Sequence, residues 1–169
     1  MTDAAPTSAP AATPPDRESI QRKRAARMAA IQGIYNLTVT ESKITMDKLS
    51  TQLQQQWHDS IAHQDAEWPI DAQPEQALLN DILQGVQSHK EAIIEAVRPT
   101  IKANWKPERM SPVMMAILHC AAYELLQHTE RNTAMLIDEY VTLAAGFFDD
   151  PELGFVHSAL QQIAQSHRP

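Results

Sequence analysis

The chain carries, at residues 22–35, the stretch RKRAARMAAIQGIY, around which the rest of the sequence is organised. Its first six residues hold four cations, and the remainder is an apolar run that ends on an aromatic ring. At about 100° per residue, Arg24, Arg27, Ile31 and Tyr35 fall on neighbouring bearings of one helix. We therefore expect the apolar end of this helix face to pack into a core. The basic end should extend beyond the core, where it faces an anionic partner.

Cations near a helix N-terminus oppose the macrodipole at a cost of up to about 1 kcal/mol each. The sequence leaves open which of two residues caps this helix. If Asp16 caps it, the cations lie a turn further in; if Ser19 caps it, Arg22 and Lys23 occupy the costly positions. In either case helix stability does not account for the cations, whereas an anionic partner does.

Charge is spread unevenly along the chain. The formal net charge is -7, which argues against a protein that coats nucleic acid by bulk attraction. Residues 17–27 hold five cations and one carboxylate, a local charge of +4, so the remainder carries -11. This asymmetry indicates a local anion-binding site on an acidic body; a solvated basic arm is the alternative that charge alone leaves open.

The composition is that of an all-α protein, since the 169 residues include only 4 glycines and many Ala, Leu, Ile, Met and Gln. This length fits one domain, or two small subdomains that share a core. The single cysteine, Cys120, allows no internal disulfide. No apolar run reaches the roughly 18 residues that span a bilayer, and we expect a cytoplasmic protein without a membrane segment.

Helical spacing of apolar residues predicts about seven helices and no strand. Residues 1–16, rich in Ala, Pro, Thr and Ser, are expected to be a disordered tail, and residues 17–169 the helical domain. A helix over 90–101 either stands alone or continues its predecessor, and Pro99 either ends or kinks it. Residues 63–73 are expected to form an irregular loop. The predicted helices cover about residues 17–38, 46–64, 74–88, 90–101, 112–126, 133–147 and 151–165, with Ser111 and Asp150 as caps before prolines.

Catalytic and metal-binding signatures are missing from the sequence: it has no Gly-rich phosphate loop, no G-x-S-x-G and no H-E-x-x-H. His58 and His63 are five residues apart, which does not place them on one helical face. His119 and Cys120 are adjacent and point about 100° apart, so they are not a nucleophile and base pair, and we expect a buried, inert thiol. No catalytic residue, metal site or cofactor is predicted, which leaves binding.

A short basic arm joined to an aromatic side chain is typical of proteins that bind single-stranded RNA. Cations hold phosphates, and an exposed ring stacks on a base for about 1–3 kcal/mol. Tyr35 and Phe155 are the candidate rings; packing in the core is the alternative for both.

Several motifs, taken in order, resemble the NusB family of transcription antitermination factors. The motifs are RKRAARMAAIQGIY at 22–35, Leu83-Gln84-Gly85-Val86, NWKPERMSPVMMAILHCAAYELL at 104–126, and IDEYVTLAAGFF with GFVHSAL within 137–160. The resemblance implies an all-helical fold of two small packed subdomains. It also implies a non-enzymatic adaptor that pairs with the ribosomal protein NusE, binds boxA-type single-stranded RNA, and serves an antitermination complex on RNA polymerase.

The resemblance also implies site residues. RNA contacts are expected at Arg22, Lys23, Arg24, Arg27, Tyr35 and Phe155, and contacts to NusE at Glu108 and Met114. The chain departs from the family at Met114, where Glu is common, and at His119, where Arg is usual. It departs again at His157 and Ser158, where the family often has Asn-Gly after Phe-Val.

Other readings stay open. The chain could be a protein-only helical interaction module whose basic arm only aids solubility. It could also resemble the helical accessory domains of RNA methyltransferases, although it contains no Gly-rich cofactor loop. Self-association is a third open point, since a homodimer that covers the basic helix would withhold it until RNA or NusE competes.

Overall fold

The structure is a computed structural model that describes residues 16–57, 72–101 and 110–169, and in these ranges it contains helices and no strand. This confirms the all-α prediction. The predicted tail up to residue 15 and most of the loop before residue 74 lie outside the described ranges. The second predicted helix ends at Gln55 rather than near residue 64, and residues 58–64 also lie outside the described ranges. The helices are α1 Arg17–Thr40, α2 Met46–Gln55, α4 Gln76–Ser88, α5 Lys90–Val97, α6 Pro112–Gln127, α7 Thr133–Ala144 and α8 Asp150–His167, with a 3₁₀ turn at Arg98–Thr100.

Side-chain caps fix the starts of α1 and α6. The carboxylate of Asp16 accepts a hydrogen bond from the Ser19 amide at 2.7 Å, so the first of the two predicted starts is correct. The Ser111 hydroxyl accepts from the Met114 amide at 3.0 Å, ahead of Pro112 at the first helical position. Arg22, Lys23, Arg24 and Arg27 consequently lie beyond the first turn of α1, where they oppose the dipole less, whereas Arg17 lies within that turn.

Two further helix boundaries differ from the predictions, and one alternative that the sequence leaves open is resolved. Helix α7 ends at Ala144 rather than near Phe147. Helix α8 begins at Asp150 itself, so the predicted Asp150 cap is wrong; Asp149 holds the cap position without a side-chain hydrogen bond. Helices α4 and α5 are separate, because the chain leaves helical geometry at His89, and Pro99 lies in the 3₁₀ turn that ends this segment.

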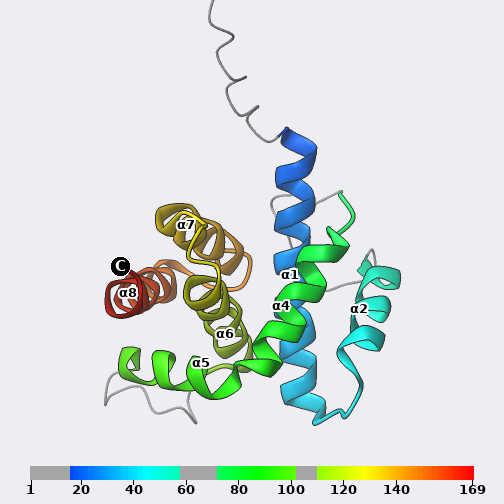
Figure 1. The fold of residues 1–169 in the computed structure, drawn as a ribbon, viewed down its shortest axis with the longest axis horizontal. Coiled ribbons are helices and arrows are strands. Elements are labelled where there is room, and N and C mark those ends of the chain that lie inside the picture. Colours follow the sequence, from blue (N-terminus) through cyan, green and yellow to red (C-terminus); the bar gives the residue numbers. More distant parts are fainter. Residues whose placement is uncertain (1–15, 58–71, 102–109) are drawn as a thin grey trace, which may run out of the picture.

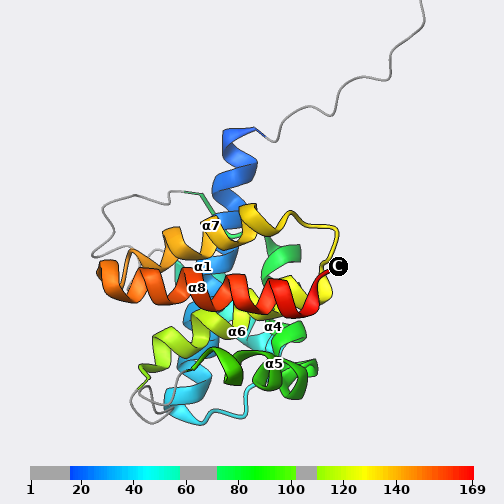
Figure 2. The same cartoon turned by 90° about the vertical axis from the view of Figure 1, so that its left-hand side faces the viewer.

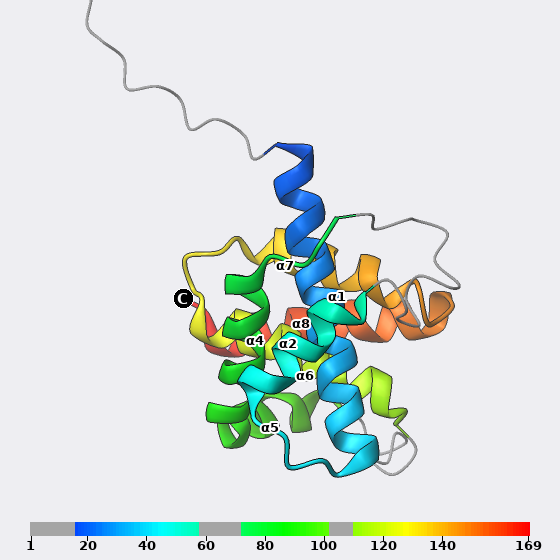
Figure 3. The same ribbon diagram turned by 90° about the vertical axis from the view of Figure 1, so that its right-hand side faces the viewer.

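Helix α6 lies at the centre of the molecule and packs against α1, α4, α5, α7 and α8. In Figure 1, α1, α2 and α4 form one group, α7 and α8 lie on the opposite side of α6, and α5 runs beneath. Figure 2 shows α7 and α8 side by side, and Figure 3 shows α2 against α4 and α1. In all three views the first turns of α1 project beyond the other helices.

The core is mostly aliphatic and surrounds α6, as its uninterrupted apolar sequence predicts. One close approach depends on glycine: a Cβ atom added to Gly85 on α4 would lie 2.0 Å from Cζ of Tyr123 on α6. The Leu83–Val86 motif therefore lets two helices meet at an aromatic ring. In the described ranges, no helix combines the length and apolar character needed to cross a bilayer.

Candidate nucleic-acid interface

The basic end of α1 presents three accessible cations. Arg17 and Arg22 are exposed, and Lys23 is partly exposed. The first turns of α1 extend past the other helices (Figure 1). Further along, the Arg22 carbonyl accepts a hydrogen bond from the Glu75 amide at 3.0 Å, so the chain before α4 packs against α1 at this level.

Arg27 does not belong to this exposed set. It is only 5% exposed, and its guanidinium donates two hydrogen bonds to Glu124 on α6, from Nε to Oε2 at 2.8 Å and from Nη2 to Oε1 at 2.9 Å. The expectation that Arg27 holds an RNA phosphate is therefore wrong for this structure. A buried cation needs a partner, and Glu124 satisfies Arg27 inside the protein.

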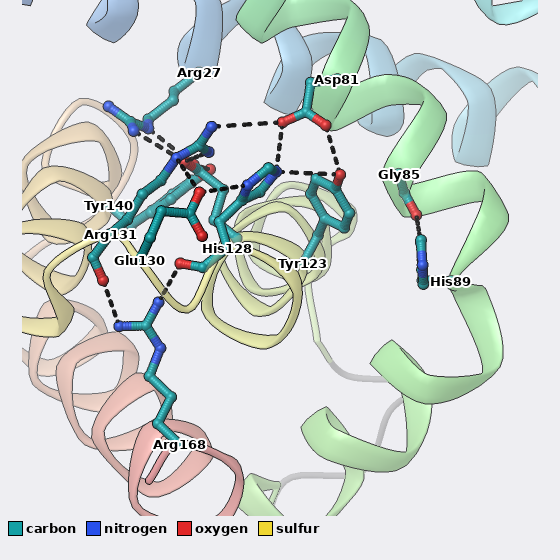
Figure 4. Close-up of polar contacts among 11 residues, drawn as sticks. Arg27, Asp81, Gly85, His89, Tyr123, His128, Glu130, Arg131, Tyr140 and Arg168 are labelled. Carbon is teal, nitrogen blue, oxygen red and sulfur yellow. Dashed lines mark hydrogen bonds and ion pairs between the residues drawn. The ribbon is translucent and has the colours of Figure 1, made fainter.

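Glu124 is fully buried and binds three side chains from different elements. Besides Arg27, it accepts from Arg131 at 2.8 Å and from the hydroxyl of Tyr140 on α7. Burial raises the pKa of Glu124, but the hydrogen bonds and charge of Arg27 outweigh it and hold this pKa below its usual range. Figure 4 shows this cluster between α1, α6 and α7, where it joins the basic helix to the rest of the fold.

Arg24 also forms an ion pair within the protein, but this pair lies nearer the surface. Its Nη2 lies 2.8 Å from Oε1 of Glu139 on α7, and its Nε donates to Oε2 at 3.2 Å. The side chains are 25% and 14% exposed, so water and ligands can reach the pair. The hydrogen bonds that Arg24 donates to Glu139 raise the pKa of Arg24, which keeps the guanidinium fully charged.

A second polar cluster lies at the turn after α6. The Tyr123 hydroxyl donates to Asp81 on α4 at 2.6 Å, and the His128 ring lies 2.7 Å from the other oxygen of Asp81. Arg168, at the end of α8, donates to the backbone carbonyls of Leu125, His128 and Arg131 and to the hydroxyl of Thr133. These bonds hold the end of α8 against the α6–α7 turn, near which the chain ends in Figure 2.

Between α1, α4 and α7 lies a groove of about 570 Å³. It has mixed charge, since Lys23 and Arg131 face Asp81 and Glu139 across it. Ile20 and Met135, which also line it, are 39% and 40% exposed. The groove therefore extends the basic end of α1 into an amphipathic surface.

The two candidate rings are on different helices and both are partly buried. Tyr35 packs on the edge of the core and keeps part of its surface exposed, as expected. It follows Arg24 by eleven residues, so the two lie roughly 16 Å apart along the helix axis. Phe155, on α8, has a similar intermediate exposure. The part of α1 between the cations and Tyr35 is buried from Ala25 to Ile31, so a ligand that touches both the cations and Tyr35 must pass over the elements that cover this part of α1.

Of the two residues expected to bind a protein partner, Met114 lies within the described ranges. Met114 is 2% exposed and belongs to the core, which corrects its expected role as a surface contact. Glu108 lies outside the described residues. Of the departures from the family, His157 and Ser158 are exposed on α8, whereas His119 is partly buried, which lowers its pKa.

Cys120 is fully buried, as predicted, and burial raises the pKa of its thiol well above the usual range. Such a thiol is a poor nucleophile because it carries little thiolate. In the described ranges, no three His, Cys, Asp or Glu side chains gather closely enough to hold a metal ion.

The partners of the arginines, Glu124 and Glu139, were missed by sequence reasoning. Glu124 lies in the most apolar helix of the chain, and a carboxylate there signals a buried cation partner. The sequence therefore indicates that Glu124 has a buried cationic partner, but it does not show which residue that partner is. Glu139 carries no comparable signal, because an acidic residue on a surface helix is ordinary.

Comparison with known proteins gives a consistent result. The sequence profile of the NusB family matches residues 24–165. The chain is 30% identical to the transcription antitermination protein NusB of Rhodospirillum rubrum, over 95% of this chain and 92% of that protein. It is 29% identical to that of Caulobacter vibrioides, over 88% and 96%. A solved structure of T. maritima NusB has the same fold, with a TM-score of 0.65 at 20% identity, over 87% of this chain and 93% of that one.

Proposed function

The chain belongs to the NusB family, and from this premise we propose that it is a non-enzymatic transcription antitermination factor acting in the cytoplasm. It binds boxA-type single-stranded RNA together with the ribosomal protein NusE, and the pair serves an antitermination complex on RNA polymerase. The observation that carries the proposal is the family match over residues 24–165, which runs from the basic end of α1 into α8.

The accessible part of α1 supports RNA as the ligand. Arg22 and Lys23 are exposed to different degrees at the basic end of α1, and Tyr35 keeps part of its surface exposed further along the same helix. Cations that hold phosphates and a ring that stacks on a base are the usual parts of a single-strand site. Phe155 is a second ring for such stacking, and Glu108 remains the residue proposed to contact NusE.

The net charge of -7 supports a role for the partner. Few accessible cations on an acidic body give weak attraction to RNA, because each phosphate contact contributes a limited amount of counterion release. NusE would add contacts that the chain lacks. We therefore propose that the affinity for boxA-type RNA is much higher for the pair than for this protein alone.

The first prediction concerns RNA affinity. A fluorescent boxA-like RNA is titrated with the protein, with NusE, and with both, at several salt concentrations. We expect tighter binding with both proteins and a log–log salt slope that becomes steeper by about 0.7 for each phosphate neutralised. Binding that NusE does not strengthen, or that does not weaken with salt, contradicts the proposal.

Matched variants separate the basic site from general charge. Arg22→Ala with Lys23→Ala should weaken RNA binding and flatten the salt slope. Lys43→Ala with Lys48→Ala is the control, since both lysines are exposed near the start of α2, beyond the opposite end of α1. An equal loss in both pairs would show a diffuse charge effect. No loss in either pair would favour a protein-only interaction module, and binding of S-adenosylmethionine would favour a methyltransferase accessory role.

A further inference from the structure

The ion pair between Arg24 and Glu139 lies at the edge of the basic site. Lys23, adjacent to Arg24 in sequence, lines the same groove as Glu139, so this carboxylate faces the region where RNA phosphates are expected. The pair is within reach of solvent, unlike the buried pair of Arg27 with Glu124. A ligand can therefore compete with Glu139 but not readily with Glu124.

The geometry of the ion pair between Arg24 and Glu139 determines which donors of Arg24 a phosphate and Glu139 would compete for. Glu139 occupies Nε and Nη2 of Arg24, which form one edge of the guanidinium fork. A phosphate that binds arginine in a bidentate manner, through two parallel hydrogen bonds, uses the same kind of edge. The reason is that the spacing of two phosphate oxygens is similar to that of two carboxylate oxygens. A phosphate at this edge must displace Glu139.

We propose that Glu139 is an internal competitor of RNA for Arg24. In the free protein its carboxylate holds Arg24 against α7, so the accessible cations of the site are Arg22 and Lys23. RNA gains the Nε–Nη2 edge of Arg24 only when a phosphate replaces the carboxylate there, which reduces the net gain. The inference rests on the proposed RNA-binding function and adds a restraint on affinity that belongs to the chain itself.

The test removes the competing charge while keeping the side-chain shape. RNA affinity and salt slope are measured for Glu139→Gln. If Arg24 becomes available for one phosphate, the slope steepens by about 0.7, and the affinity at 0.1 M salt rises about five-fold, since 0.1 M raised to the power −0.7 is about five. Circular dichroism and an unfolding curve confirm that the variant is folded.

Asp138→Asn is the matched control. Asp138 is adjacent to Glu139 on α7 and acts on Arg24 through its charge, and the same single negative charge is lost in its variant. Loss of charge alone should change affinity equally in both variants. Release of Arg24 should give a distinctly larger gain for Glu139→Gln than for Asp138→Asn.

Arg24→Ala completes a double-mutant cycle. In the wild-type background it should reduce affinity little, because Arg24 is held by Glu139. In the Glu139→Gln background it should remove the whole five-fold gain. The proposal is overturned if Asp138→Asn and Glu139→Gln behave alike, or if the gain survives Arg24→Ala.

A second readout does not depend on affinity. The Nε–H signal of Arg24, followed by NMR, should change on addition of boxA-like RNA in the Glu139→Gln protein more than in the wild type. Equal responses would overturn the inference while leaving RNA binding intact. If RNA binds to none of the five proteins (the wild type, the three single variants and the double variant), the proposed function fails and this inference fails with it. That result is distinct from equal binding by all five.

Discussion

At the scale of single residues, Glu124 is the side chain on which most of the buried polar structure depends. It receives hydrogen bonds from Arg27, Arg131 and Tyr140, and it is fully buried. Glu124→Gln leaves the shape nearly unchanged but removes the charge that compensates two arginines. We expect the free energy of unfolding to fall by about 3–5 kcal/mol, measured by urea denaturation, because a buried ion pair that loses one partner leaves an uncompensated charge.

The pH dependence gives an independent check on Glu124. Its pKa is lower in the folded protein than in the unfolded chain, so its ionised form stabilises the fold above the unfolded value of about 4.3. This contribution is lost as the pH falls through the lower, folded pKa. In Glu124→Gln, the free energy of unfolding should therefore decrease less as the pH is lowered through this range. The exposed Glu130 is the control: Glu130→Gln should change the free energy of unfolding much less than Glu124→Gln does.

At the scale of helices, two glycines should respond oppositely to the same substitution. Gly85→Ala places a Cβ atom against the Tyr123 ring, whose hydroxyl is held by Asp81, so the ring cannot move freely. We expect a loss of about 1–3 kcal/mol from overpacking between α4 and α6. Gly154, inside α8, has nothing within 4 Å of such a Cβ. Gly154→Ala should stabilise the protein by up to about 1 kcal/mol, because alanine favours the helix.

Thermal unfolding of both variants measures this difference. An equal loss in the two proteins would mean that the contact with Tyr123 is not what requires glycine at position 85. Similar stabilisation in both would mean that α4 and α6 can separate enough to admit a methyl group.

The helices themselves were largely predictable because their signals are local. Asp16 and Ser111 mark their helix starts through a cap within three residues, and the apolar spacing of α6 identifies it as the central helix. The start of α8 was misplaced by one residue because Asp149 and Asp150 offer equivalent caps in sequence. Helix ends that depend on tertiary packing, as at Ala144, have no comparable local mark.

The roles of the arginines were not predictable in the same way. Arg24 and Arg27 share one stripe of α1 and have similar neighbours in sequence, yet one is near the surface and the other is buried. Their partners are 115 and 97 residues away, on α7 and α6. Only the packing of three helices decides which cation meets which carboxylate, and a single sequence does not contain that pairing as a local pattern.

At the scale of the whole molecule, the central position of α6 predicts a single unfolding transition. The α1, α2 and α4 group and the α7 and α8 group both bury their apolar faces against α6. Glu124 also binds side chains from α1, α7 and the turn between α6 and α7. Neither group keeps its core without α6, so the two groups should unfold together.

Two probes test this cooperativity in urea. Trp57 is 1% exposed and follows α2, so in a variant with Trp68→Phe and Trp105→Phe its fluorescence reports the first group. Far-UV circular dichroism reports all helices. The two curves should coincide, with the same midpoint and the same m-value. If Trp57 were lost at lower urea while most of the helical signal remained, the two groups would be separately stable, and α6 would belong to only one of them.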